Sequence, residues 1–73
     1  MAVQVVMDHT GDTRYRYDAD DERSLFEARE RFRQLTEQGY TAAVRGTEGS
    51  SRLVRSFEPN ADETLFFPRL VGG

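Results

Sequence analysis

The 73-residue chain contains no cysteine, no tryptophan and no lysine, and it has one histidine and two prolines. Without cysteine it can form no disulfide, no thiolate metal site and no cysteine nucleophile. His9 has neither a second histidine nor a cysteine as a partner, so we interpret it as a solvated turn residue. Neither a Ser-His-Asp triad nor a paired-carboxylate site is indicated, and we expect that the chain is not an enzyme.

Long apolar runs are also missing. The apolar stretch of residues 2–7 is too short for a signal sequence or a membrane span, and no positive charge precedes it. We therefore expect a cytoplasmic protein without a membrane partner. The chain has 13 acidic residues against 10 basic ones, all of them arginine, for a net charge of -3. Because nucleic-acid-binding domains usually carry a basic excess, we do not expect a nucleic-acid partner.

The length and composition indicate one small globular domain. Hydrophobic residues make up 37% of the chain, and five phenylalanines and three tyrosines are available for a core. A domain of this size buries only about 60% of its unfolded surface, so these few large side chains must supply most of its stability.

The N-terminal residues predict a β-hairpin. Residues 3–7 and 13–18 alternate between two faces, and the turn-forming residues 8–12 separate them. We expect Tyr15 and Tyr17 to face the core.

A helix is predicted next. The acidic residues of the segment 18–22 precede Ser24-Leu25-Phe26-Glu27, which matches the S-x-x-E capping box, so the helix should start between Asp21 and Ser24. Capping explains the acidic run better than a cation site does, because the EF-hand spacing is absent, and no metal site is predicted. One apolar stripe consists of Leu25, Ala28, Phe32 and Leu35. We expect an ion pair between Glu27 and Arg31, and a helix end at Gly39.

The second half of the chain predicts further strands. Residues 40–44 and 52–57 each indicate a strand, although the inward face of the second is ambiguous. Residues 46–51 between them indicate a turn rather than a phosphate loop, because they lack lysine and open no helix. A loop over residues 58–63 leads to a short strand over 64–67 that ends at Pro68. The expected class is α+β in the order β-β-α-β-β-β, with a mixed sheet of four to five strands wrapped around one helix.

The sequence ends in Gly72-Gly73. A C-terminal glycine has no side chain to block a narrow active site, and its backbone reaches conformations that other residues avoid. Such a carboxylate can be adenylated with ATP and then passed on as a thioester, an amide or a thiocarboxylate. An accidental glycine pair is the alternative.

Both ends of the chain resemble ubiquitin-like proteins. Val3-Gln4-Val5-Val6, followed by Thr10-Gly11-Asp12-Thr13 and an acidic helix start, resembles the opening of ubiquitin. Glu63-Thr64-Leu65 with Arg69-Leu70 and the diglycine is similar to the ubiquitin tail. Asp62-Glu63, Phe66-Phe67-Pro68 and Gly72-Gly73 resemble the ending of the small, sulfur-carrying subunit of molybdopterin synthase.

This resemblance implies a β-grasp domain over residues 1–68 and a flexible tail over 69–73. It further implies that an E1-like adenylating enzyme, which uses ATP, recognises the tail, that Gly73 reacts and that Gly72 provides clearance. Docking contacts would come from Phe66, Phe67, Arg69, Leu70 and Val71, although core packing is the alternative role for the phenylalanines. The carrier would be a monomer without a bound cofactor. Gly73 would be conjugated to target proteins or converted to a thiocarboxylate for a sulfur-acceptor enzyme.

A non-catalytic β-grasp interaction module is the rival hypothesis. Four arginines could line one exposed sheet face and bind an acidic partner or RNA: Arg14, Arg16, Arg52 and Arg55. The exposed edge of the fourth strand could also bind a partner, and the tail would then be incidental. Under the carrier hypothesis, the missing lysines mean that the chain offers no side-chain amine to which another Gly73 could be joined.

Overall fold

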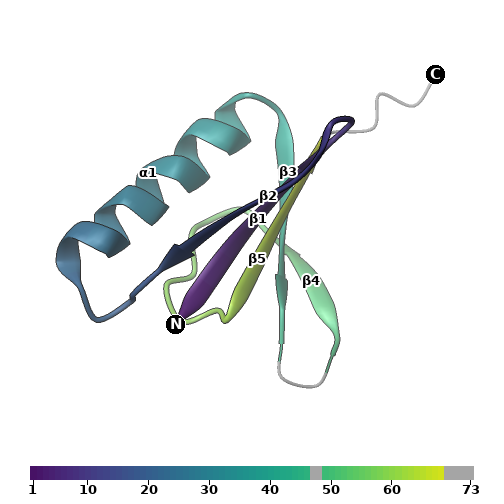
Figure 1. The fold of residues 1–73 in the computed structure, drawn as a ribbon. Coiled ribbons are helices and arrows are strands. Elements are labelled where there is room, and N and C mark those ends of the chain that lie inside the picture. The colour runs from purple at the N-terminus through teal and green to yellow at the C-terminus, as the bar shows by residue number, and fades with distance from the viewer. Residues whose placement is uncertain (47–48, 69–73) are drawn as a thin grey trace.

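The computed structural model describes residues 1–46 and 49–68, which form one helix and a five-stranded mixed sheet (Figure 1). The elements follow one another as β1 (Ala2–Asp8), β2 (Gly11–Tyr17), α1 (Glu22–Glu37), β3 (Tyr40–Arg45), β4 (Ser51–Val54) and β5 (Glu63–Pro68). The predicted α+β class, with a single helix beside a mixed sheet, is confirmed. Within the described residues, the helix lacks the length and apolar character needed to cross a membrane.

The strands lie in the spatial order β2-β1-β5-β3-β4. β1 is antiparallel to β2 and parallel to β5, while β3 is antiparallel to both β5 and β4. The last strand of the chain therefore lies in the centre of the sheet, directly beside the first. β1 and β5 are distant in sequence, so their pairing is a long-range contact. It joins the β1–β2 hairpin to the other three strands in one sheet.

The predicted N-terminal hairpin is confirmed. Its register runs from Ala2 opposite Tyr17 to Asp8 opposite Gly11, so His9 and Thr10 form a two-residue loop. The Asp8 carboxylate accepts a hydrogen bond from the backbone N–H of Thr10 at 2.8 Å. Gly11 has a φ of 127°, which a residue with a side chain rarely adopts. The exposed His9 lies in the turn, as predicted.

The helix begins where the sequence predicts, but with a different cap. Asp21 is the N-cap, and its Oδ2 accepts a hydrogen bond from the backbone N–H of Ser24 at 2.9 Å. The capping box at Ser24 is thus wrong: Ser24 lies inside the first turn, where its Oγ accepts from the backbone N–H of Asp18. An aspartate caps a helix as well as a serine does, so Asp21 starts the helix three residues earlier. Gly39, with a φ of 100°, follows the last turn as expected.

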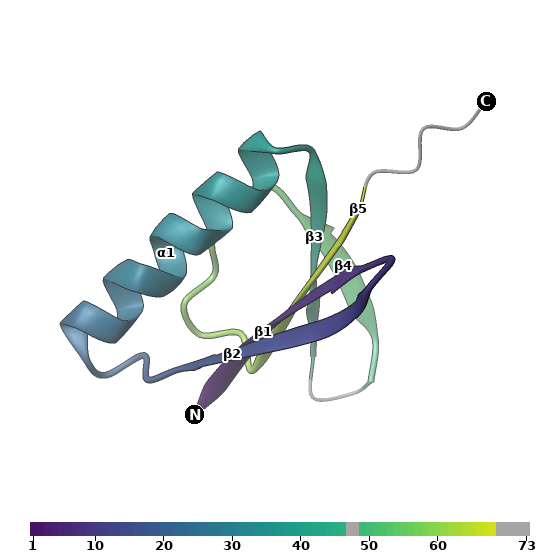
Figure 2. The same cartoon turned by 45° about the horizontal axis from the view of Figure 1, so that its top comes forward.

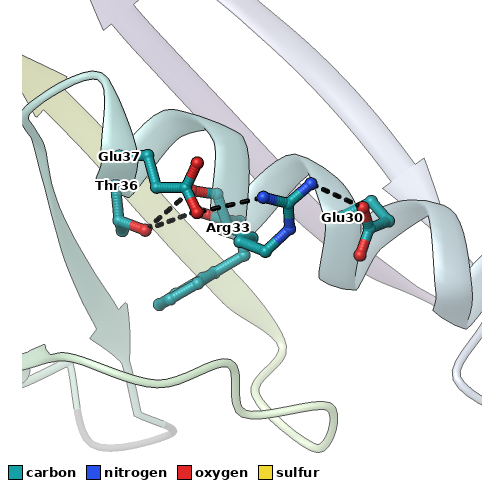
Figure 3. A network of polar contacts seen from close by, with 5 residues as sticks. Glu30, Arg33, Thr36 and Glu37 are labelled. Atoms are coloured by element: carbon teal, nitrogen blue, oxygen red, sulfur yellow. Dashed lines mark hydrogen bonds and ion pairs between the residues drawn. The ribbon is translucent and has the colours of Figure 1, made fainter.

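The arginines of α1 form different pairs from the one predicted. Glu27 and Arg31 form no ion pair; Arg31 instead turns toward the sheet. On the solvent side, Arg33 contacts Glu30 at 2.9 Å and Glu37 at 3.0 Å (Figure 3). Exposed pairs of this kind contribute little to stability. The helix is therefore held by its buried face rather than by these charges.

The core lies between α1 and one face of the sheet. Ala28 and Phe32 of the predicted helical stripe are buried, and Leu25 and Leu35 are half-buried. The Phe32 ring packs edge-on against Phe66 of β5, with centroids 5.5 Å apart. Tyr17 is buried as expected, whereas Tyr15 is partly exposed.

The segment predicted as a strand over residues 52–57 is shorter than expected. β4 ends at Val54, which packs into the core, while Leu53 points away from it. Phe57 lies outside the strand. Its ring centroid is 5.9 Å from the ring centroid of Tyr17 and 5.9 Å from that of Phe32. The chain between β4 and β5 passes on the helix side of the sheet (Figure 2). Phe57 is thus brought against the core, half-buried, by this connection and not by strand pairing.

Candidate functional site

The sheet has a second face that the helix does not cover. Its residues alternate with those that contact α1, such as Gln4 and Phe66. The strand register aligns one residue from each strand across this open face. The row consists of Arg14, Val5, Leu65, Ala43 and Leu53, in the order β2-β1-β5-β3-β4. We use the term open face for this surface and its neighbouring rows.

Burial changes along the row. Val5 is 3% exposed and Ala43 is 5% exposed, although both lie on the face opposite to the helix. Leu65 is half-buried, and Leu53 at the β4 edge is 70% exposed. Arg14 stands at the β2 edge. The open face is therefore an apolar stripe that is bordered by a cation on one side and reaches solvent on the other.

The end of β5 lies at one end of this face. Tyr40 pairs with Pro68, and Thr41 pairs with Phe67. Since β5 runs parallel to β1, Pro68 lies at the same end of the sheet as the β1–β2 turn (Figure 1). Phe67 is half-buried and Pro68 is exposed. The predicted site residues Arg69, Leu70, Val71, Gly72 and Gly73 lie outside the described residues.

Phe66 does not serve as a surface docking contact. It is fully buried against Phe32, whereas Leu65 and Phe67 are half-buried on the open face. In β5, Phe66 therefore points toward the helix and into the core, which is the alternative role expected for the phenylalanines. Leu65 and Phe67 point toward the open face. The sequence Leu65-Phe66-Phe67 is apolar at every position, so its pattern does not reveal which face the helix covers.

The four arginines predicted to line one face do not lie together. Arg14 and Arg16 are on β2, while Arg52 is on β4 at the opposite edge of the sheet, with Arg55 just beyond it. Arg52 pairs in register with the buried Val44, so it lies on the helix side. There its Nη2 contacts the Glu58 carboxylate at 2.6 Å. The three strands between β2 and β4 exclude a single arginine-lined surface.

A polar cluster between the helix and the sheet was not predicted. Gln4 is fully buried, and its Nε2 donates to the carbonyl oxygen of Ala28 at 2.9 Å. Arg31 Nη1 donates to Gln4 Oε1 at 2.8 Å, and its guanidinium lies 4.1 Å from the centroid of the Tyr15 ring. Thr64, beside Gln4 in register, has a buried hydroxyl without a hydrogen-bond partner. A glutamine within the apolar run of β1 was the signal that could have revealed this cluster.

The pKa shifts have local structural causes. The hydrogen bonds from Thr10 lower the pKa of Asp8, and the hydrogen bond from Arg33 lowers the pKa of Glu30 (Figure 3). Burial, followed by the nearby charge of Asp62, raises the pKa of Tyr17. In the part of the chain that the structure describes, no cluster of three or more acidic or histidine side chains could hold a metal ion. Asp8, Glu30 and Tyr17 thus lie in a turn, on the helix and in the core, respectively.

Comparisons with known proteins return no match. No protein-family model, no curated protein and no solved structure matches this chain. Function must therefore be argued from the residues and their arrangement.

Proposed function

We propose that this protein is a β-grasp carrier or modifier whose C-terminal Gly73 is adenylated by an E1-like enzyme. The observation that carries the proposal is the position of β5. This central strand ends at the exposed Pro68, and the sequence beyond it leads through Arg69-Leu70-Val71 to the diglycine. A reactive carboxylate on such a segment can enter a partner's active site while the sheet stays folded.

The arrangement of the elements supports the β-grasp assignment. A β-grasp sheet carries its first and last strands side by side and in parallel at the centre, with hairpins on both sides and a helix across one face. The strand order β2-β1-β5-β3-β4, with α1 packed over Gln4, Ala42 and Phe66, is compatible with this description.

The chemistry requires only the terminal carboxylate from this chain. An oxygen of the Gly73 carboxylate attacks the α-phosphorus of ATP, and pyrophosphate leaves. A thiolate, an amine or hydrosulfide then attacks the acyl carbon, and AMP leaves. The products are a thioester, an amide or a thiocarboxylate, respectively. The enzyme supplies the catalytic groups, and the carrier supplies a chain end without side chains.

The open face supports recognition by the activating enzyme. It offers a half-buried apolar stripe through Leu65 and Phe67, next to the end of β5. Arg14 and Arg16 on β2, which is separated from β5 by β1, provide cations for carboxylates of a partner. We assign docking to this face, with Phe67 in place of the buried Phe66.

The test starts with the mass of the protein isolated from its own cells, which must correspond to a chain with a free carboxylate at Gly73. The purified protein is then incubated with ATP and an adenylating enzyme from the same genome. We expect ATP-dependent pyrophosphate exchange and an acyl-adenylate by intact mass. Replacement of one oxygen by sulfur selects the thiocarboxylate product, and an isopeptide from Gly73 on other proteins selects conjugation.

A matched pair of glycine variants controls for folding. Gly73→Ala should abolish or strongly reduce the exchange. Gly46→Ala should not, because Gly46 lacks a positive φ and an added Cβ would meet Ser50 only at ordinary contact distances. If Gly73 carries no free carboxylate in the cell, or if no such enzyme forms an adenylate, the carrier proposal is wrong. The rival interaction module would then be favoured, with the exposed Leu53 as its leading observation.

A further inference from the structure

The two edges of the sheet are β2 and β4, and they differ in length, with seven residues in β2 and four in β4. β2 pairs with β1 along its whole length, and its Tyr15 and Tyr17 lie on the helix side. β4 has only four residues and pairs with β3 alone among the described strands, so its other side is a free edge within residues 1–46 and 49–68. A free edge presents unpaired backbone N–H and C=O groups to solvent. It is a natural site for an additional strand.

A hollow lies beside this edge. It has a volume of about 310 Å³ and lies between β4, the start of β3 and the last turn of α1. Its lining consists of Thr36, Tyr40, Thr41, Ala42, Leu53, Val54 and Arg55. Leu53 is the most exposed large apolar residue within this lining. The hollow can therefore accept an apolar side chain from a strand that pairs with β4.

The charge at this edge determines which strand fits. Among the described residues that line the hollow, Arg55 is the one with a charged side chain. The ion pairs among the described residues include Arg52 with Glu58 but none with Arg55. Although the chain has a net charge of -3, this edge is thus locally cationic. A carboxylate on an incoming strand would pair with Arg55.

We propose that β4 binds an acidic, extended segment of a partner protein by strand addition. The backbone of the segment pairs with the free edge of β4, one of its apolar side chains enters the hollow, and a neighbouring carboxylate contacts Arg55. A second copy of this chain fits less well, because its β4, with the sequence Ser-Arg-Leu-Val, has no carboxylate to pair with Arg55. The site does not involve Gly73 and does not depend on the carrier proposal.

The experiment is an NMR titration of the full-length, ¹⁵N-labelled protein with the peptide acetyl-Glu-Val-Asp-Val-Glu-Val-amide. We expect saturable shifts of the backbone amides of residues 51–55 and of Thr36 and Tyr40, and slower amide exchange in β4. The amides of β2 should not shift. A peptide of the same sequence with alternate backbone N-methyl groups should bind at least tenfold more weakly, because it cannot pair as a strand.

Two charge reversals, one at the β4 edge and one on α1, test the chemistry of the site. Arg55→Glu should weaken peptide binding by about threefold to tenfold, since it replaces an attraction with a repulsion near solvent. Arg23→Glu, in the first turn of α1, makes the same charge change and should leave binding unaltered, because it lies at the opposite end of the helix from the hollow. Both residues are exposed, so both variants should fold, which their amide spectra will report.

Three results would overturn the proposal. The first is that the backbone amide signals of β4 do not shift at millimolar peptide. The second is that the amide signals of β2 and β4 shift equally. The third is that the β4 amide signals shift with the concentration of the protein alone, which would identify a second copy as the occupant. Deleting Gly72 and Gly73 should not alter peptide binding, so failure here is separate from failure of the carrier proposal.

Discussion

The two faces of the sheet bury apolar side chains in different ways. On the helix-covered face, Phe66 contacts Phe32 of a second layer and is fully buried. On the open face, Val5 and Ala43 are almost as inaccessible, yet no second layer of the described chain covers them. The burial ends at Leu53 at the sheet edge, which is 70% exposed. The covered face therefore holds the domain together, while the open face remains available for contact with another protein.

The largest expected effect comes from the covered face. Phe66→Ala should lower the free energy of unfolding by about 3–5 kcal/mol, since it leaves a cavity against Phe32. The total for a domain of this size is about 4–11 kcal/mol. Leu65→Ala, the neighbouring residue on the open face, should cost about 1–2 kcal/mol because its side chain is only half-buried.

Urea unfolding followed by circular dichroism measures this difference. If Phe66→Ala does not fold, Phe66→Leu replaces it, with an expected cost of about 1–1.5 kcal/mol. Equal costs at positions 65 and 66 would show that both faces contribute equally to stability.

The second expected effect is a difference in the free energy of unfolding between two arginine variants, one at Arg31 on the helix-covered face and one at Arg14 on the open face. Arg31→Ala should destabilise the domain by about 1–3 kcal/mol, because it leaves the buried Oε1 of Gln4 without its donor and removes the stacking on Tyr15. Arg14→Ala on the open face should change the stability by less than about 0.5 kcal/mol.

The same urea experiment tests this pair of variants. Arg31→Lys should recover only part of the loss, because an ammonium group cannot stack as a planar guanidinium does. If Arg14→Ala lowered the free energy of unfolding more than Arg31→Ala did, the contribution of the polar cluster to packing of α1 on the sheet would be contradicted.

The smallest expected effect is a loss of folding stability at alkaline pH, which is caused by Tyr17 on the helix-covered face. Burial raises the pKa of Tyr17 above its ordinary value of 10.0, so this phenol ionises earlier in the unfolded chain than in the folded one. Its contribution is fully present below pH 10 and is lost as the pH rises toward the folded pKa. Tyr17→Phe should remove this loss.

Thermal unfolding between pH 8 and about pH 11 provides the measurement. At neutral pH, Tyr17→Phe should cost little, since the hydroxyl contacts only the carbonyl oxygen of Pro59, at the long distance of 3.5 Å. Parallel pH curves for the two proteins would contradict the prediction.

Local patterns in the sequence predicted the elements well. The hairpin, the helical stripe through Ala28 and Phe32, and the stop at Gly39 each depend on a few neighbouring residues. Two predictions that depended on the distant neighbours of individual side chains were wrong. Arg31 turned to Gln4 rather than Glu27, and Phe57 entered the core from a loop. The apolar run of β5 could not show which of its side chains the helix covers.

The features of the candidate site also divide into those that local sequence reveals and those that depend on which strands are neighbours. The diglycine and the missing lysines are evident from the sequence, because they concern which chemical groups exist. The open face and the β4 edge are not, because they depend on which strands become neighbours. Arg14 and Arg55 differ little as sequence signals, yet the sheet order places them at opposite edges.

The sequence by itself determined the available chemistry. It has no thiol and no lysine amine, and it contains the pair Gly72-Gly73, which has no side chains. It also determined the order of the strands and the helix along the chain, through patterns that span only a few residues. The tertiary structure alone decided that β5 lies between β1 and β3, that α1 covers one face, and that β4 is left as a free edge. These are long-range pairings, in which distant segments meet because their combined burial outweighs the entropy lost in bringing them together.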